Sequence, residues 1–210
     1  MYKFLLAAAF SAVASVAGAT TIVVDGQSAV YGAGIGGNGV SLAASEFSFT
    51  PANDLYITAS YLGGTTDCCG PTSSPRAGAD GAALTGGSGT NIGALNGISG
   101  IIGPTQQFLV GVFVNSANLP TSSSTAPGTL NFNNIGTRFS ELNPLLNQSF
   151  WIGDGLTNTG SGDQQKFYAP DGADTLWLGF ADGGGFFGAP FYYGDNVGAL
   201  TMSIEANSTP

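Results

Sequence analysis

Basic side chains are scarce in this chain. Among 210 residues there are four Lys and Arg and no His, against 13 Asp and Glu, which gives a net charge of −9. Proteins that bind nucleic acid rely on many Lys and Arg contacts to phosphates, so this composition excludes nucleic acid as a partner. The same deficit argues against binding to an anionic membrane surface. The absence of His also removes the commonest side chain of general acid–base catalysis.

Cysteine is scarce as well, and the two residues present, Cys68 and Cys69, are neighbours. Adjacent cysteines cannot join distant parts of the chain, so no disulfide framework is predicted. A vicinal disulfide in an oxidising compartment would be strained, because the usual bridge needs Cα atoms further apart than neighbouring residues allow. Three interpretations stay open: a reduced pair in a loop, a local bridge that adds little stability, and a redox role.

Long apolar runs are missing except at the N-terminus. Residues 4–17 are apolar, follow Lys3, and end in the small-residue pattern Ala17-Gly18-Ala19. The run is too short to span a bilayer and has the parts of a signal peptide. We therefore predict a leader over residues 1–19, with a buried core helix as the alternative. Because no later run is long enough for a membrane helix, we expect no membrane insertion and a secreted protein, either extracellular or at the cell surface.

Helix signals are weak, and strand signals are frequent. The chain has 34 Gly, each of which costs about 1 kcal/mol in a helix interior relative to Ala, and no segment shows a capped helical period. One short turn or helix is predicted at residues 139–146. Short β-branched or aromatic segments bounded by Gly, Pro, Asn or Asp predict strands. These segments are residues 21–25, 45–50, 55–61, 107–114, 149–152, 166–168, 175–180 and 199–205.

The pattern of these strands predicts an all-β fold. Apolar and polar residues alternate in residues 55–61 and 199–205, as in strands with one buried face. Short strands without crossover helices are typical of an antiparallel β-sandwich or jelly roll. We predict one such domain over residues 20–206, long loops near residues 70–100 and 118–128, and a tail at residues 207–210.

Oxygen-bearing side chains are concentrated around the segment before the last predicted strand. Asp182 ends one apolar strand, and Asp195 and Asn196 precede the next. Ca²⁺ takes its ligands from carboxylates, amides and backbone carbonyls, so a loop pinned between two strands can bring these groups and a carbonyl such as that of Tyr192 together. The alternative is a polar hairpin loop in which the same side chains make only Asx turns.

Several motifs resemble those of the PA-I-type galactophilic lectins and their exported bacterial relatives, many of which carry a PEP-CTERM sorting tail. The matching motifs are FWIGDG at 150–155, QQKFYAP at 164–170, LWLGFAD at 176–182 and YGDN at 193–196. The resemblance implies a jelly-roll-like, galactose-binding-like sandwich with Ca²⁺ bridging protein and sugar hydroxyls. It assigns as metal ligands Asp182, the Tyr192 carbonyl, Asp195, Asn196 and the Cys69 carbonyl, which precedes Gly70-Pro71-Thr72.

The chain departs from the lectins in one respect that concerns specificity. Those lectins hold a sugar hydroxyl with a His, and this chain has none, so galactose specificity does not carry over. Asp80 lies in the corresponding loop as a candidate substitute, although an Asp-Gly pair is more often a turn. Candidate ligand-binding residues are Asp80, Asp182, Asp195 and the aromatic residues Phe187, Phe191 and Tyr193. These aromatic rings either stack on a sugar or fold inward to pin the loop.

The sequence leaves three classes of function to compare: a carbohydrate-binding protein, a structural subunit and an enzyme. The leading hypothesis is a secreted, calcium-dependent protein that binds extracellular carbohydrate or polysaccharide. The alternative is a structural matrix or surface-layer subunit that self-assembles as a homo-oligomer, in which calcium only stiffens a loop. We expect no enzymatic activity: a glycoside hydrolase needs a carboxylate pair with one pKa raised in apolar surroundings. The sequence places none of its four candidate carboxylates in such surroundings, namely Asp154, Asp163, Asp182 and Asp195.

Overall fold

The computed structural model describes residues 17–68, 76–83 and 89–209. Strands account for 47% of the residues and helices for 6%, which confirms the prediction of an all-β fold. Each of the eight predicted segments contains a strand. These strands are β1 (Ala17–Asp25), β4 (Ser45–Ser48), β5 (Leu55–Asp67), β8 (Val110–Val114), β11 (Ser149–Trp151), β14 (Lys166–Tyr168), β15 (Thr175–Gly179) and β17 (Val197–Ser208).

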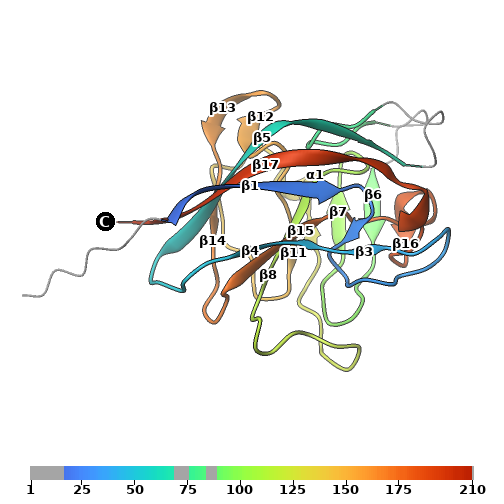
Figure 1. The fold of residues 1–210 in the computed structure, drawn as a ribbon, viewed down its shortest axis with the longest axis horizontal. Helices are drawn as coiled ribbons and strands as arrows, with labels where there is room; N and C mark the ends of the chain where they lie inside the picture. The colour runs from blue at the N-terminus through green and yellow to red at the C-terminus, as the bar shows by residue number, and fades with distance from the viewer. Residues whose placement is uncertain (1–16, 69–75, 84–88, 210) are drawn as a thin grey trace, which may run out of the picture.

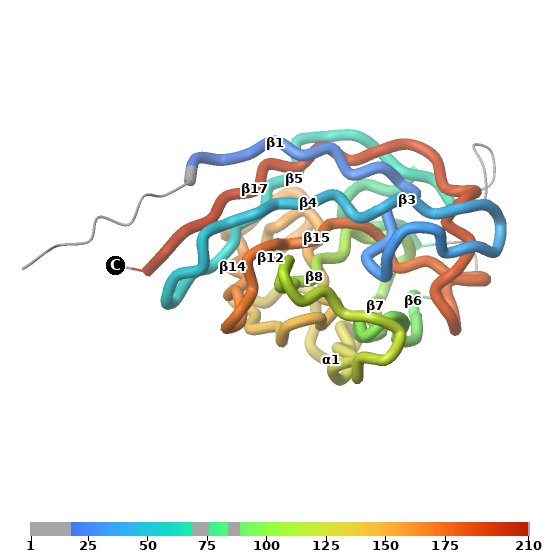
Figure 2. The backbone as a smooth tube through the Cα atoms, turned by 60° about the horizontal axis from the view of Figure 1, so that its bottom comes forward, coloured from blue at the N-terminus to red at the C-terminus, as the bar shows by residue number. Residues whose placement is uncertain are grey.

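The main strands form two sheets in a sandwich-like arrangement. One sheet has the order β1-β17-β5-β14-β10, in which β10 is Glu141–Leu142, and the other has the order β11-β8-β15-β4. Figure 1 shows β1, β17 and β5 running side by side, and Figure 2 shows them as a layer above β4, β15 and β8. The longest ladder pairs β17 with β5 in antiparallel register from Val197↔Asp67 to Ser208↔Leu55.

The alternation read from the sequence matches the buried face of these strands. Leu200, Met202 and Ile204 are buried on β17, while the polar residues between them are partly exposed. Phe150 bridges the two sheets, because its ring stacks on Phe113 of β8 at 5.2 Å and contacts Phe167 of β14 at 5.4 Å. Burial of such side chains contributes roughly 1.5–3 kcal/mol each, which makes this core the main source of stability.

Several short strands were not predicted. A third sheet has the order β16-β6-β7-β9, and two small pairs, β2 with β3 and β12 with β13, complete the strand content. Their bounds are β2 (Ser28–Ala29), β3 (Leu42–Ala43), β6 (Thr90–Ile92), β7 (Ile101–Gly103), β9 (Leu130–Asn131), β12 (Leu156–Asn158), β13 (Ser161–Gln164) and β16 (Phe187–Gly188).

Two predictions about irregular segments need correction. The segment 70–100 was predicted as a loop with little to bury, but its described residues include β6 and the buried side chains of Ala77, Ala79, Ile92 and Ile98. Residues 139–146 contain strand β10 and no helix. The α-helix lies earlier, at α1 (Phe132–Ile135), where the Asn131 side chain caps its first turn. Residues 118–128 carry no helix or strand, as predicted.

The predicted leader lies largely outside the described residues. Its last three residues, Ala17 to Ala19, begin β1, and the regular register with β17 starts at Thr20↔Ile204. In the described part of the chain, no helix is both long and apolar enough to cross a membrane.

Candidate functional site

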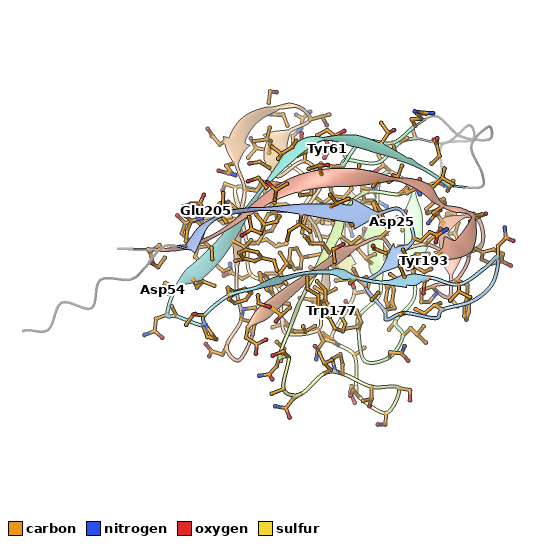
Figure 3. All side chains as sticks on the ribbon, in the orientation of Figure 1. Asp25, Asp54, Tyr61, Trp177, Tyr193 and Glu205 are labelled. Atoms are coloured by element: carbon orange, nitrogen blue, oxygen red, sulfur yellow. The ribbon has the colours of Figure 1, made fainter. Side chains whose placement is uncertain are left out.

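The candidate metal-binding residues lie at one end of the sandwich. Asp182 follows β15, while Asp195 ends the 3₁₀ helix η2 (Tyr193–Asp195) and Asn196 follows it directly before β17. Figure 3 shows Tyr193 at the same end as Asp25, the last residue of β1, and Glu205 of β17 toward the opposite end. The start of β17 therefore brings this loop beside the end of β15.

Asp182 is buried, with 2% of its surface exposed. Its Oδ1 accepts a hydrogen bond from the Gly183 backbone N–H at 2.6 Å, whereas its Oδ2 has no partner. Burial raises the pKa of Asp182 to about 7, and the negative charge of Asp195 raises it further, while the side chain of Asn196 and the Gly183 N–H lower it. A buried carboxylate with a free oxygen is costly unless a cation or a donor compensates it.

Asn196 presents a second unpartnered oxygen beside Asp182. The residue is 1% exposed, and its Nδ2 donates to the Gly26 carbonyl at 3.0 Å. This bond fixes the orientation of the amide, and the buried Oδ1 is left without a hydrogen-bond donor. The Asn196 side chain lowers the pKa of Asp182 by a hydrogen bond and compensates the carboxylate only in part, because Asp182 Oδ2 and Asn196 Oδ1 are both buried without a well-aligned donor. Such atoms usually have a partner in native structures.

Asp195 is partly exposed and supplies a second carboxylate. Its Oδ2 accepts a hydrogen bond from Asn38 Nδ2 at 3.1 Å. Its effect on the pKa of Asp182 shows that the two carboxylates interact. Among the residues that the structure describes, no third Asp, Glu or Cys side chain joins them. The structure therefore brings together Asp182, Asp195 and Asn196, a donor set of two carboxylates and one amide.

The chain near the N-terminus holds this loop in place, which the sequence did not reveal. Gln27 Nε2 donates to the carbonyls of Gly194 and Asn196 at 3.2 Å each. The segment 36–39 packs so closely against the loop that a Cβ on Gly194 would lie 2.1 Å from the Asn38 carbonyl oxygen. The only sequence signal for this support was the Gly-rich run Gly36-Gly37-Asn38-Gly39.

Of the two predicted carbonyl ligands, the structure describes only Tyr192. Tyr192 has a left-handed backbone with φ of 78°, and its N–H donates to the Gly36 carbonyl at 3.4 Å. Cys69 lies outside the described residues, so its ligand role stays a prediction. The end of β5, the nearest described strand, is compatible with this role, because Asp67 of β5 pairs with Val197, the residue after Asn196.

The predicted aromatic platform is only partly available. Tyr193 is fully buried, and its hydroxyl donates to the Phe180 carbonyl and accepts from the Asp182 N–H. Of the two alternatives predicted for this ring, Tyr193 takes the inward one and pins the loop from inside, so its candidate role in ligand binding is wrong. Phe187 is 49% exposed, and Phe191 and Tyr192 are also exposed, so these three rings face solvent.

Asp80 makes no described contact with the loop that holds Asp195 and Asn196. Its Oδ1 accepts the Asp154 N–H at 2.9 Å, and it lines a separate pocket. The role predicted for it as a substitute for the lectin histidine is therefore not supported by its contacts. The expectation that no candidate carboxylate lies in apolar surroundings is also wrong for two residues, because Asp154 and Asp182 are both buried and burial raises the pKa of each.

Fold and site together define an all-β, sandwich-like protein with a buried cluster of oxygen donors at one end. Comparison with known protein families, curated proteins and solved structures finds no match to this chain. The resemblance to the galactophilic lectins stays a prediction from sequence motifs. The donor set itself, carboxylates with an amide oxygen, is of the kind that hard divalent cations such as Ca²⁺ prefer.

Proposed function

We propose that this chain is an extracellular protein that binds Ca²⁺ through Asp182, Asp195 and Asn196 and uses the ion to bind carbohydrate. The cation would compensate the charge of the two carboxylates and coordinate both unpartnered oxygens. Backbone carbonyls of Tyr192 and Cys69 would add ligands. Sugar hydroxyls would fill the remaining positions of an ion that takes 6–8 oxygens.

One observation carries the calcium proposal: Asp182 Oδ2 and Asn196 Oδ1 are both buried and both lack a hydrogen-bond donor. An Asx turn, the alternative explanation of this sequence, satisfies side-chain oxygens with nearby backbone N–H groups. Asp182 Oδ1 does so with Gly183, but its second oxygen does not. The pair is therefore better explained by a bound cation than by turn geometry alone.

The sugar-binding part of the proposal is supported by the surroundings of the loop. Phe187, Phe191 and Tyr192 lie within or beside the segment that links Asp182 to Asp195, and all three are exposed. Aromatic rings that stay in solvent offer apolar faces to the C–H faces of sugars. Because Tyr193 is buried, Phe187 and Phe191 are the remaining candidates among the rings predicted from the sequence.

The test combines calcium titration with sugar binding. Isothermal titration calorimetry should show one Ca²⁺ per chain, and Asp182→Asn should abolish the heat. The matched control is Asp171→Asn, which removes the same charge from an exposed residue. A glycan array probed in Ca²⁺ and in EDTA should then show calcium-dependent binding. Absence of calcium binding by the wild-type chain would contradict the whole proposal, and calcium binding without any glycan would contradict its second half.

A structural matrix subunit is the second candidate, and exposed apolar side chains favour it. Val23 on β1, Leu42 of β3 and Val40 just before β3 are exposed, and β1 is an edge strand of the five-stranded sheet. Exposed apolar residues on sheet edges promote pairing between copies of a chain. Light scattering in Ca²⁺ and in EDTA separates the two functions: calcium-dependent growth in mass without sugar binding supports the matrix subunit.

A further inference from the structure

A second polar pocket lies away from the residues of the calcium proposal. It has a volume of about 270 Å³ and opens beside the β12–β13 hairpin. Charged, amide, hydroxyl and indole groups line it together. Its principal lining residues are Asp80, Arg138, Trp151, Thr157, Asn158 and Thr159.

Arg138 differs from the other cations of the described chain. Arg76 lies 3.6 Å from Asp67, and Lys166 lies 3.1 Å from Glu141. Arg138 is exposed at the pocket and makes no ion pair or hydrogen bond with any described residue. In a chain with net charge −9, a guanidinium that avoids every available carboxylate is free to bind an external one.

Trp151 provides a second donor without an acceptor. The residue is 3% exposed, and its ring stacks on Phe108 at 4.3 Å. Its indole N–H makes no hydrogen bond with a described residue and lies at the wall of the pocket, where it is open to solvent. The N–H is therefore available to donate to a ligand oxygen.

The pocket also contains a fixed acceptor. Asp80 Oδ1 accepts the Asp154 N–H, while its Oδ2 makes no hydrogen bond with the described residues. The adjoining wall is rigid, because Asp154 accepts the N–H groups of Leu156 and Gly160 and thereby holds the start and the turn of the hairpin. Donors and an acceptor are therefore presented on a preorganised surface, which reduces the entropy lost on binding.

The pocket continues into a neighbouring groove of about 500 Å³. The two share Thr137 and Arg138, and the groove is lined by Phe132, Phe139 and the exposed Ile135. Arg138 thus stands between a polar pocket and a more apolar groove. This arrangement suits a chain molecule better than a small isolated anion.

We propose that this pocket binds a uronic acid unit of an acidic polysaccharide, independently of calcium. The sugar carboxylate would pair with Arg138, a ring or hydroxyl oxygen would accept the Trp151 N–H, and a sugar hydroxyl would donate to Asp80 Oδ2. Adjacent sugar units would lie along the neighbouring groove. A fully ionised inorganic anion such as sulfate has no hydroxyl to donate to Asp80, whereas a uronate unit offers hydroxyl donors as well as a carboxylate.

The test is calorimetry in EDTA with short oligomers of galacturonate, glucuronate and mannuronate, and with the methyl esters of the same oligomers. At least one acid form should bind, and its ester should bind at least tenfold more weakly, because a charged hydrogen bond is lost. Arg138→Gln should cause a similar loss. Lys166→Gln, which removes an equal charge elsewhere, should have no effect. Equal binding of acid and ester, or failure of all three acids to bind, would overturn the proposal.

Two further variants separate a direct role from a structural one. Trp151→Phe keeps an aromatic ring against Phe108 but removes the N–H together with part of the indole, and Asp80→Asn keeps an oxygen for the Asp154 N–H. Asp80→Asn should melt like the wild-type chain, whereas Trp151→Phe should melt at a lower temperature because it leaves a cavity. Both variants, while folded, should bind the acid oligomer several-fold more weakly. Unchanged affinity in both would also overturn the proposal. Because EDTA is present throughout, these results do not depend on whether the calcium proposal holds.

Discussion

Asp154 and Asp182 make an instructive pair. Each follows a strand that contributes to the core, each precedes a Gly, and each is buried. Both oxygens of Asp154 accept backbone N–H groups, from Leu156 and Gly160, whereas only one oxygen of Asp182 has a partner. Burial of an Asp therefore does not mark a binding site here. The unsatisfied oxygen distinguishes a candidate ligand from a structural residue.

The largest expected difference between Asp182 and Asp154 is in how each makes the stability of the folded chain depend on pH. The Asp182 pKa is about 7 in the folded chain, against an ordinary value of 3.8. The folded state then holds its proton more tightly than the unfolded state, so the stabilisation is complete below pH 3.8 and is lost as pH rises to about 7. In EDTA, the free energy of unfolding should fall over this interval by up to about 4 kcal/mol.

Chemical denaturation at pH values between these limits, in EDTA, measures this loss. Asp182→Asn is the reference, because it removes the titrating group and leaves the contribution of Asp154 in place. The difference between wild type and variant should therefore vary with pH. A constant difference would show that the Asp182 carboxyl does not titrate abnormally, and would remove one reason for placing a cation there.

Asp154→Ala should have the next largest effect. The substitution leaves the N–H groups of Leu156, at the start of the β12–β13 hairpin, and of Gly160, in its turn, without their acceptor. Loss of these two charge-assisted bonds should destabilise the chain by about 3 kcal/mol, as measured by urea denaturation. Its calcium response should be that of the wild type. A lost calcium response in a folded Asp154→Ala chain would break the proposed distinction between the two residues.

Calcium itself should stabilise the wild-type chain by about 2.7 kcal/mol at a hundredfold excess over Kd. The measurement is thermal melting with Ca²⁺ and with EDTA, and Asp182→Asn should show no shift. The shift should be larger at pH 8 than at pH 5.5, because Asp182 must release its proton before it binds the ion. A shift of equal size at both pH values would indicate that the ion binds elsewhere.

The same comparison shows what the sequence could and could not reveal. Strand alternation predicted the main strands and the buried face of β17, and the spacing of the oxygen-bearing residues around the last strand placed Asp182, Asp195 and Asn196 in one candidate site. The sequence left open which aromatic rings fold inward. The inward position of Tyr193 depends on the Phe180 carbonyl and the Asp182 N–H, which only the fold brings close to its hydroxyl. Nor were the contacts of Gln27 and Asn38, which lie more than 150 positions from the loop they hold. The contact between Asp80 and the Asp154 N–H could not be predicted for the same reason.

Asn38 provides the finest test of the site, with the smallest expected effect. Its amide holds the carboxylate of Asp195, which is partly exposed and has more freedom than Asp182. In Asn38→Ala the carboxylate must be ordered by the ion alone, so calcium affinity should fall several-fold, by about 1 kcal/mol, while binding persists. Calorimetry measures this change, with Asn53→Ala in an exposed turn as the control. Complete loss of binding in a folded Asn38→Ala chain would instead identify the Asn38 side chain as a ligand.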